Sequence, residues 1–357
     1  MNAENIVYNY VMEMSKNGVE QHSDAWKELR KYGIGGSQIA KVIGTCAYGT
    51  LEEYLHEKVG ITSAFSSNEY TQWGNLFEDL IKTYVELDKN CKIFGENLFD
   101  DSKMDLGLYY SPDGIAVING EITLLEFKCP FKRKINNSIP DHYLSQVQLG
   151  LDIINICAHG LYVEGVFRYC SLKQMNFGKD FNMSMNQSSM GREVKAVGFI
   201  GFKWKAGTEA ARDKYNKTRA SSKCETTALV DFGDKSDIKE LLALCDSNVL
   251  DYTYNMVTAN KSYPKSYYTA EMYLQEFKYS GGDILGVLPW KLLRVDYHKV
   301  ERCAGTGFIE RHRGAIENVV KVLRACRGKT RDECKKIVEK SLVPEIAEDK
   351  DDISLYL

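Results

Sequence analysis

The sequence lacks the features of a secreted or membrane-embedded protein. Residues 1–10 carry no basic segment followed by an apolar run, so we expect no secretory signal. No stretch approaches the roughly 18 apolar residues that a membrane span requires. The ten cysteines include no CxxC pair, and the spacing of Cys303, Cys326 and Cys334 fits no common zinc or iron–sulfur pattern. We therefore expect an intracellular protein with reduced thiols.

An excess of positive charge is also missing, because 46 Lys and Arg residues are outnumbered by 49 Asp and Glu, for a formal net charge of −3. Contact with nucleic acid would therefore need a local basic groove or bound metal ions. This disfavours a passive coating protein more than an enzyme that carries divalent cations. The 357 residues, 44% hydrophobic and 27% charged, predict a folded chain with one large domain or a domain with a substantial insertion.

Hydrophobic periodicity predicts an α/β organisation. A glycine-rich run at Gly33–Gly36 leads into a short helix for which Ser37 is the expected N-cap. Helices are expected at 3–15, 24–30, 73–87, 141–154 and 310–327, strands at 161–169, 196–204 and 292–300, and a polar loop at 177–189.

Two motifs, Ser111-Pro112-Asp113-Gly114 and Leu125-Glu126-Phe127-Lys128, flank a predicted hairpin. Asn119-Gly120 between apolar runs favours a type I′ turn. With these as the loop residues, Asp113 falls opposite Glu126 and Ser111 opposite Lys128. The two carboxylates would then have Cβ atoms roughly 5 Å apart on one sheet face. Such a pair repels unless a cation intervenes, and oxygen ligands select Mg²⁺ or Mn²⁺.

The plainer alternative is an exposed hairpin whose charged residues form surface ion pairs. Against it, residues 115–117 and 122–127 place apolar side chains on both faces, which is typical of a buried central strand. Buried carboxylates need a metal or a charged partner. A third carboxylate, Glu78, lies on or beside the buried face of the 73–87 helix, whereas Asp79 and Glu86 are expected to be solvated.

These segments, in this order, resemble the family of the phage lambda exonuclease and the YqaJ-type viral recombinases, within the PD-(D/E)XK nuclease superfamily. The resemblance implies a restriction-endonuclease-like core, with a central mixed sheet flanked by helices. It also implies a deoxyribonuclease that degrades duplex DNA from the 5′ end and leaves 3′ single strands. The matching stretches are DAWKELR, GIGGSQIAKVIG, WGNLFED, SPDG, LLEFKCPF and YLSQVQLG, within residues 24–155, and more faintly VDYHKVER at 295–302.

The resemblance also implies roles for individual residues. It implies two Mg²⁺ ions (Mn²⁺ is the alternative) and a pocket for the terminal 5′-phosphate. The expected metal ligands are Asp113, Glu126, Glu78 and the Phe127 carbonyl. Lys128 would orient or help deprotonate the attacking water, and Gln146 would be the active-site glutamine. The 5′-phosphate would be bound by Arg30, Ser37 and Ser111.

The resemblance leaves several questions open. A structure-specific or nicking endonuclease and a non-catalytic recombination scaffold are the alternative functions, and a Cas4-like iron–sulfur nuclease is disfavoured by the cysteine spacing. The family also suggests a single-strand annealing partner, a homo-oligomer, and the cytoplasm or nucleus of a host if the source is viral. The expected divisions are a nuclease core at 1–170, an insertion at 171–285, a C-terminal strand and helices at 286–340, and an acidic tail at 341–357.

The expected insertion has a basic segment, for which DNA contact and a solvated charged helix are equally weighted. Its basic residues are Lys203, Lys205, Arg212, Lys214, Lys217 and Arg219.

Overall fold

The computed structural model describes most of the chain. The described residues are 2–17, 19, 23–63, 68–95, 98–133, 137–175, 194–221, 229–246, 249–258, 272, 274–277 and 284–342. The expected loop at 177–189 and the acidic tail lie outside these ranges. In the described part, no helix combines the length and the apolar character that crossing a membrane requires.

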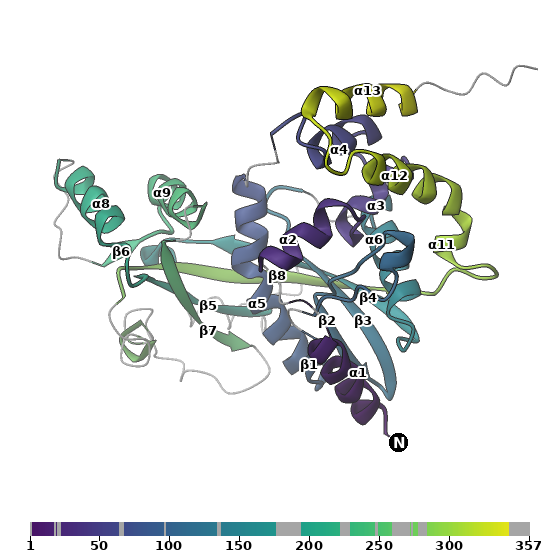
Figure 1. The fold of residues 1–357 in the computed structure, drawn as a ribbon. Coiled ribbons are helices and arrows are strands. Elements are labelled where there is room, and N and C mark those ends of the chain that lie inside the picture. The colour runs from purple at the N-terminus through teal and green to yellow at the C-terminus, as the bar shows by residue number, and fades with distance from the viewer. Residues whose placement is uncertain are drawn as a thin grey trace, which may run out of the picture.

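Within the described residues, one mixed sheet of eight strands runs through the molecule (Figure 1). Its order is β1-β2-β3-β4-β8-β5-β7, and β6 pairs with β8. The β3–β4 and β6–β8 pairs are parallel and the others antiparallel. The expected α/β fold with a central mixed sheet flanked by helices is therefore confirmed. The strands are β1 (Ile93–Phe94), β2 (Gly114–Ile118), β3 (Glu121–Lys128), β4 (His159–Tyr169), β5 (Ala196–Trp204), β6 (Val230–Asp231), β7 (Leu250–Thr258) and β8 (Gly286–Val300).

The long strand β8 joins the two halves of this sheet. It pairs with β4 from Trp290 to Val300 and with β5 from Gly286 to Leu292. The strand predicted at 292–300 is therefore longer than expected, because its first residues pair with the segment between β4 and β8 in the chain. That segment extends the same sheet by three strands, as the long arrow of β8 shows (Figure 1).

Helices cover both faces of the sheet. The expected helices at 3–15, 24–30, 73–87 and 141–154 are all present, with ends shifted by a few residues. The α-helices are α1 (Ala3–Asn17), α2 (Asp24–Lys31), α3 (Ile39–Val42), α4 (Leu51–Lys58), α5 (Glu69–Lys89), α6 (Asp141–Ile153), α8 (Glu209–Ser221), α9 (Lys235–Asp246), α11 (Phe308–Arg311), α12 (Arg313–Ala325) and α13 (Arg331–Leu342); the 3₁₀ helices are η1 (Gly36–Gln38), η2 (Met104–Leu106) and η3 (Leu172–Gln174).

Alternation along β3 separates two hydrophobic cores. Ile122 and Leu124 pack into one core, with residues of α3, α6 and α12. Leu125 and Phe127 pack into the other, with the apolar face of α5. A strand that is apolar on both faces must lie inside the sheet, as the sequence predicted. Glu126 lies between these residues and belongs to the face that α6 covers.

Two local predictions are wrong. Ser37 is not an N-cap but lies inside the 3₁₀ helix η1, where Gly35 holds the capping position. The helix expected at 310–327 is divided into α11 and α12 at His312, whose backbone angles are not helical.

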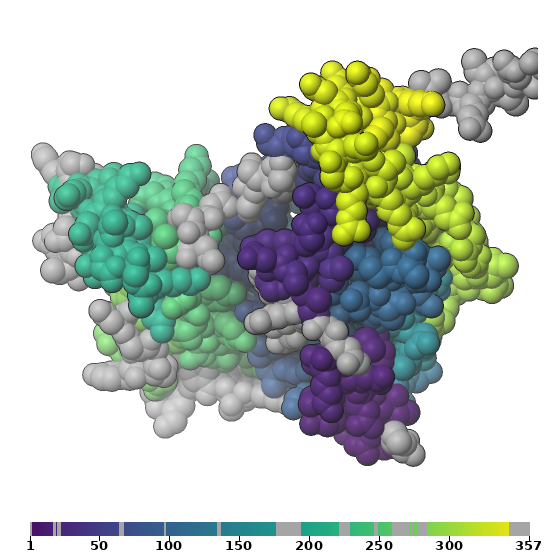
Figure 2. All heavy atoms as spheres, viewed as in Figure 1, coloured from purple at the N-terminus to yellow at the C-terminus, as the bar shows by residue number. Residues whose placement is uncertain are grey.

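The basic segment for which DNA contact and a solvated helix were equally weighted forms the end of β5 and most of α8. In Figure 2 the teal surface of α8 lies at one end of the molecule and the yellow surface of α13 lies far from it. Arg219 donates to the Tyr215 hydroxyl at 3.3 Å, and Arg212 lies 3.6 Å from Asp213. These contacts occur within one charged, solvated helix.

Candidate active site

The hairpin that presents the candidate catalytic residues has the predicted turn and register. Ile118 pairs with Glu121 and Gly114 with Leu125, so the loop consists of Asn119 and Gly120 alone. Asn119 has φ of 51° and Gly120 has φ of 84°. Positive φ at both loop positions is the requirement of a type I′ turn. The turn therefore sets the register that brings the two motifs together.

Four polar interactions join the motif around Asp113 to the motif that contains Glu126 and Lys128. The Phe127 amide donates to Asp113 Oδ2 at 2.7 Å. Lys128 Nζ donates to Glu126 Oε1 and, at 2.9 Å, to the Phe127 carbonyl. The same ammonium lies 3.7 Å from Asp113 Oδ2. The two carboxylates and the lysine thus meet at the ends of β2 and β3.

Burial gives this group its electrostatic character. Glu126 is fully buried, and burial together with the nearby charge of Asp113 raises its pKa to about 7. Burial lowers the pKa of Lys128, but the Glu126 and Asp113 carboxylates outweigh this effect and hold it well above its ordinary value. Lys128 therefore stays protonated, and its ammonium supplies part of the positive charge that the carboxylates require.

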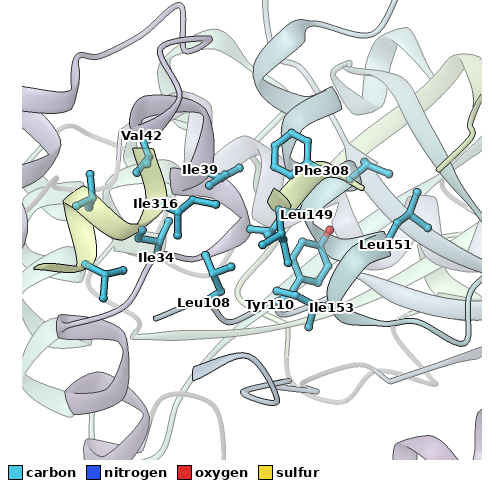
Figure 3. Packing of buried hydrophobic residues seen from close by; sticks show 14 of the residues in the cluster. Ile34, Ile39, Val42, Leu108, Tyr110, Leu149, Leu151, Ile153, Phe308 and Ile316 are labelled. Carbon is cyan, nitrogen blue, oxygen red and sulfur yellow. The ribbon is translucent and has the colours of Figure 1, made fainter. Parts of the chain in front are cut away.

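Tyr110 is a site residue that the sequence did not single out. Its hydroxyl donates to Glu126 Oε2 at 3.0 Å, and its ring is fully buried beside Leu149 (Figure 3). A Cβ on Gly36 would lie 2.6 Å from this ring, and one on Gly150 would lie 2.4 Å from it. Both glycines thus make room for the tyrosine that holds Glu126. The sequence feature that could have pointed to Tyr110 is its position three residues before Asp113.

Glu78 faces the same group from α5. Its carboxylate makes an ion pair with Lys82 at 2.9 Å. Burial and the charge of Asp113 raise its pKa, and Lys82 and Lys128 act in the opposite direction. Three acidic side chains therefore interact where the ends of β2 and β3 face the middle of α5. Lys82, one helical turn after Glu78, is a second nearby cation that the sequence did not single out.

The two carboxylates expected to be merely solvated have specific partners instead. Asp79 accepts a hydrogen bond from the Tyr252 hydroxyl of β7 at 3.0 Å. Glu86 accepts one from the Ile93 amide of β1 at 2.9 Å. Both fix α5 against the sheet and leave Glu78 as the acidic residue of this helix that faces Asp113.

A divalent cation fits the chemistry of this group. The donors are hard oxygens of Asp113, Glu126 and the Phe127 carbonyl, with Glu78 nearby, which is the donor type that Mg²⁺ and Mn²⁺ prefer. Burial and the charge of Asp113 raise the pKa of Glu126, and a bound cation would offset both effects. In the described ranges, no three His, Cys, Asp or Glu side chains already stand in metal-binding geometry, and the Lys128 ammonium supplies the positive charge in this structure.

Gln146 and Ser111 both lie beside Tyr110. Gln146 is buried on α6, and its Cγ would be 3.3 Å from a Cβ on Gly36, the glycine against which Tyr110 packs. The neighbouring Ser145 hydroxyl lies 3.0 Å from that of Thr45, so α6 is fixed to the segment that follows α3. Ser111 is half-buried and directly follows Tyr110.

Arg30 lies at a second place, by the ring of Tyr109, and Ser37 lies between two residues, Gly36 and Gln38, of which Gln38 binds the Tyr109 hydroxyl. The Arg30 guanidinium is 4.1 Å from the Trp26 ring centroid and 5.7 Å from that of Tyr109. Ser37 is exposed, and the next residue, Gln38, accepts hydrogen bonds from the Tyr109 hydroxyl and the Gly35 amide, each at 3.2 Å. The glycine-rich run is thereby fixed beneath Arg30.

The glycine-rich run leads into a short helical segment, as the sequence predicted. It opens the three residues of η1 and the four of α3, so the helix dipole expected at an anion site is small. Its glycines instead accommodate aromatic rings. A Cβ on Gly35 would lie 2.5 Å from the Tyr109 ring. A Cβ on Gly36 would lie 2.6 Å from the Tyr110 ring.

A further buried carboxylate that the sequence did not single out is Glu164 on β4. It is fully buried, forms an ion pair with Arg133, and accepts a hydrogen bond from the Tyr162 hydroxyl at 2.6 Å. Its neighbour on β3 is Lys128. The available signal was one acidic residue inside the apolar run of β4.

Comparison with known families identifies the part of the chain that carries this site. Residues 25–155 match the YqaJ-like viral recombinase domain. This confirms the family resemblance inferred from residues 24–155. The fainter resemblance at 295–302 lies outside the matched part and stays a prediction.

Two viral proteins are similar over about half of the chain. A protein of African swine fever virus is 30% identical over 196 residues, which are 48% of this chain and 57% of that protein. An uncharacterized protein of Acanthamoeba polyphaga mimivirus is 26% identical over 182 residues, 47% of this chain and 32% of that protein. The chain thus spans little more than half the length of the first of these relatives.

Two solved structures are also similar. They are LHK-Exo in complex with dAMP, and the alkaline exonuclease LHK-Exo from Laribacter hongkongensis. The first is 19% identical with a TM-score of 0.33, the second 18% identical with a TM-score of 0.32; each match covers 40% of this chain and 73% of the other.

Proposed function

Starting from the match of residues 25–155 to the YqaJ-like viral recombinase domain, we propose that this chain is a Mg²⁺-dependent deoxyribonuclease. It degrades double-stranded DNA from a 5′-phosphorylated end in the 5′→3′ direction and leaves 3′ single strands. The observation that carries the proposal is the hydrogen-bonded group of Asp113, Glu126 and Lys128 at the ends of β2 and β3.

The metal site of the proposed enzyme consists of Asp113, Glu126, the Phe127 carbonyl and Glu78. Two ions, Mg²⁺ or alternatively Mn²⁺, would activate the attacking water and stabilise the charge on the leaving 3′ oxygen. This donor set is supported by the oxygen ligands and by the raised pKa values of Glu126 and Glu78.

The protein groups have complementary parts in this proposal. Lys128 holds the water in line with the phosphorus and donates hydrogen bonds to developing negative charge, because its raised pKa keeps it protonated. Tyr110 fixes one oxygen of Glu126 and so orients the carboxylate. Gln146, buried against Gly36, positions the substrate from α6.

The proposed choice of a DNA end rests on a phosphate pocket formed by Arg30, Ser37 and Ser111. Arg30 supplies a planar group with several donors, which suits a phosphate. Its support is the placement of the guanidinium over Tyr109, one residue from the tyrosine that holds Glu126. The terminal phosphate would then lie near the catalytic group.

The test uses three DNAs with Mg²⁺: a linear duplex with 5′-phosphate, the same duplex with 5′-hydroxyl, and covalently closed circles. We expect rapid loss of the phosphorylated duplex, intact circles, and no activity in EDTA. Cleavage of the circles would replace the proposal with a structure-specific or nicking endonuclease. No cleavage with Mg²⁺ or Mn²⁺ would leave a non-catalytic recombination scaffold.

The biological setting follows the same proposal. An enzyme that leaves 3′ single strands serves DNA recombination, repair or viral genome processing, and a single-strand annealing protein would be its partner. The similarity to viral proteins favours action inside an infected host cell. Its oligomeric state, for which a homo-oligomer is the prediction, is measurable by light scattering of the purified protein.

A further inference from the structure

A second cation, Lys58, lies beside Arg30 at the C-terminal ends of α4 and α2. Its ammonium donates a hydrogen bond to the Arg30 carbonyl. It lies 5.9 Å from the centroid of the Tyr109 ring, and the Arg30 guanidinium lies 5.7 Å from the same centroid. Two positive side chains from separate helices therefore flank one buried ring.

Neither Arg30 nor Lys58 has an ion-paired carboxylate in the part of the chain that the structure describes. The nearby rings of Trp26, Tyr54 and Tyr109 are uncharged. Burial and the positive charge of Arg30 lower the pKa of Lys58 to about 7, and the charge of Glu57 acts in the opposite direction. Two half-buried basic side chains without an ion-paired carboxylate form a place where an anion is favoured.

Lys58 also retains donors that a ligand can use. An ammonium has three N–H groups, and the Arg30 carbonyl takes one of them. A purely structural role, in which Lys58 caps the last turn of α2, explains this hydrogen bond. It does not explain why a second positive charge lies beside Arg30. An exposed lysine nearby, Lys31, could satisfy the C-terminus of α2 without burial.

The chain connects this cation pair to the catalytic group through consecutive residues. Tyr109 lies under Arg30 and Lys58, and the next residue, Tyr110, donates to Glu126. Gln38, which follows Ser37, accepts a hydrogen bond from the Tyr109 hydroxyl. The purple surface of α2 lies on the face seen in Figure 2, so the helix that carries Arg30 is open to solvent there.

We propose that Lys58 and Arg30 together bind a phosphomonoester dianion, and that Lys58 determines preference for a DNA end carrying 5′-phosphate over one carrying 5′-hydroxyl. This inference rests on the proposed function and adds to the pocket a residue outside Arg30, Ser37 and Ser111. Lys58 is a positioning residue: it fixes the end of the substrate and takes no part in bond cleavage.

The experiment compares wild type, Lys58→Gln and Lys58→Arg, with Lys31→Gln as the matched control. Lys31 is exposed, so Lys31→Gln removes one positive charge next to Arg30 and leaves Arg30 and Lys58 unchanged. Binding of 5′-phosphate and 5′-hydroxyl duplexes is measured by fluorescence anisotropy in EDTA, and cleavage of both in Mg²⁺. Because each variant is judged by its ratio between the two ends, general damage to the protein cancels.

We expect Lys58→Gln to lower the 5′-phosphate preference about tenfold in both assays, the size of one lost charge-assisted hydrogen bond. Lys58→Arg should restore most of it, and Lys31→Gln should match wild type. An unchanged ratio in Lys58→Gln, with normal thermal stability, would overturn the inference. So would an equal loss of preference in Lys31→Gln.

Two further arms separate this inference from the proposed function and from free phosphate as the ligand. If wild type binds 5′-phosphate ends preferentially but cleaves no DNA, the nuclease proposal fails while the pocket stands. If inorganic phosphate raises the Tm of wild type but not of Lys58→Gln, and neither protein distinguishes the two DNA ends, the pocket binds free phosphate and the assignment to DNA ends is overturned.

Discussion

Two regions of the molecule hold like charges together, and they do so in opposite ways. At the ends of β2 and β3, Asp113 and Glu126 are brought together, and the fold supplies its own counterion in Lys128. Around Tyr109, Arg30 and Lys58 are brought together with aromatic rings and a carbonyl but no ion-paired carboxylate in the described ranges. The first region is partly balanced within the protein; the second depends on a ligand for its balance.

The contrast separates catalysis from substrate placement. A partly balanced group keeps its geometry before the metal arrives, because Lys128 and the Tyr110 hydroxyl already hold Glu126. An unbalanced cation pair gains most from an incoming anion and so discriminates strongly between charged and neutral DNA ends. The predictions below test this division, beginning with the largest effect.

Replacing Lys128 with alanine should remove the counterion of the carboxylate group and lower the cleavage rate on the order of a thousandfold. DNA binding should stay nearly intact, since the cation pair around Tyr109 is untouched. Metal affinity should not fall, because Asp113 and Glu126 lose a competing positive charge. Single-turnover cleavage, anisotropy in EDTA and Mg²⁺ titration measure the three effects.

The matched control is Lys132→Ala, which removes an exposed lysine paired with Glu69 and should cleave normally. Wild-type rates in Lys128→Ala would sink the role given to Lys128. A parallel loss of DNA binding would show that the two regions are not separable.

The sequence alone could predict the hairpin because its determinants are local. Asn119-Gly120 sets the turn and hence the register, and period-2 alternation places Glu126 away from Leu125 and Phe127. The partners of the site come from distant segments. Tyr110 reaches Glu126 only because Gly150 on α6 leaves space for its ring, and no local pattern encodes that contact.

The same limit applies to the phosphate pocket and to the second half of the chain. Lys58 of α4 meets the Arg30 carbonyl of α2 through a contact between separate helices, which the sequence does not reveal. The segment between β4 and β8 was expected to be an insertion of unknown role, yet β5 pairs along β8. Strand pairing between segments far apart in sequence depends on the whole sheet rather than on a motif.

Replacing Tyr110 with phenylalanine should lower the cleavage rate about tenfold at neutral pH. In the metal-free protein the hydroxyl stabilises the ionised form of Glu126, so its loss raises a pKa that is already about 7 and leaves fewer molecules with a charged carboxylate for Mg²⁺ to bind. The defect should shrink as pH rises. The measurement is a pH profile of kcat for both proteins.

Tyr162→Phe is the matched control for this variant. It removes another tyrosine hydroxyl that donates to a buried carboxylate, Glu164, outside the proposed metal site. We expect similar loss of stability but a normal pH profile. Identical profiles for the two variants would mean that the Tyr110 hydroxyl acts only on folding.

The 5′-phosphate preference should fall severalfold as pH rises above neutrality. Lys58, with a pKa of about 7, loses its charge there, whereas the phosphate remains a dianion. Tyr54 and Tyr109 also lie near Lys58, but burial raises the pKa of each above its ordinary value. Glu57 raises the pKa of Lys58. The measurement is the ratio of kcat/KM for the two DNA ends against pH.

Lys58→Arg is the control, since its ratio should stay flat over the same range. The folded-state pKa of Lys58 lies below its ordinary 10.5, so the folded protein binds fewer protons than the unfolded chain between these values. The contribution of Lys58 to the stability of the folded protein therefore rises as pH increases from about 7 to 10.5. A flat ratio in wild type would show that Lys58 does not carry the discrimination.

The smallest effect is on stability without metal. Asp113→Asn removes a charge that repels Glu126, so in EDTA at mildly alkaline pH we expect Tm to rise by a few degrees, the size of about 1 kcal/mol. Added Mg²⁺ should stabilise wild type more than the variant. Asp105→Asn, at an exposed position, is the matched control and should change neither value.

The sign of the pH dependence provides a second check on the same variant. The pKa of Glu126 is raised from 4.5 to about 7, so the folded state holds more protons than the unfolded chain between these values. Stability in EDTA should therefore fall as pH rises through this window, and less steeply in Asp113→Asn. Equal slopes in the two proteins would show that Asp113 does not act on Glu126, and the carboxylate region would then lack the like-charge repulsion that makes it a metal site.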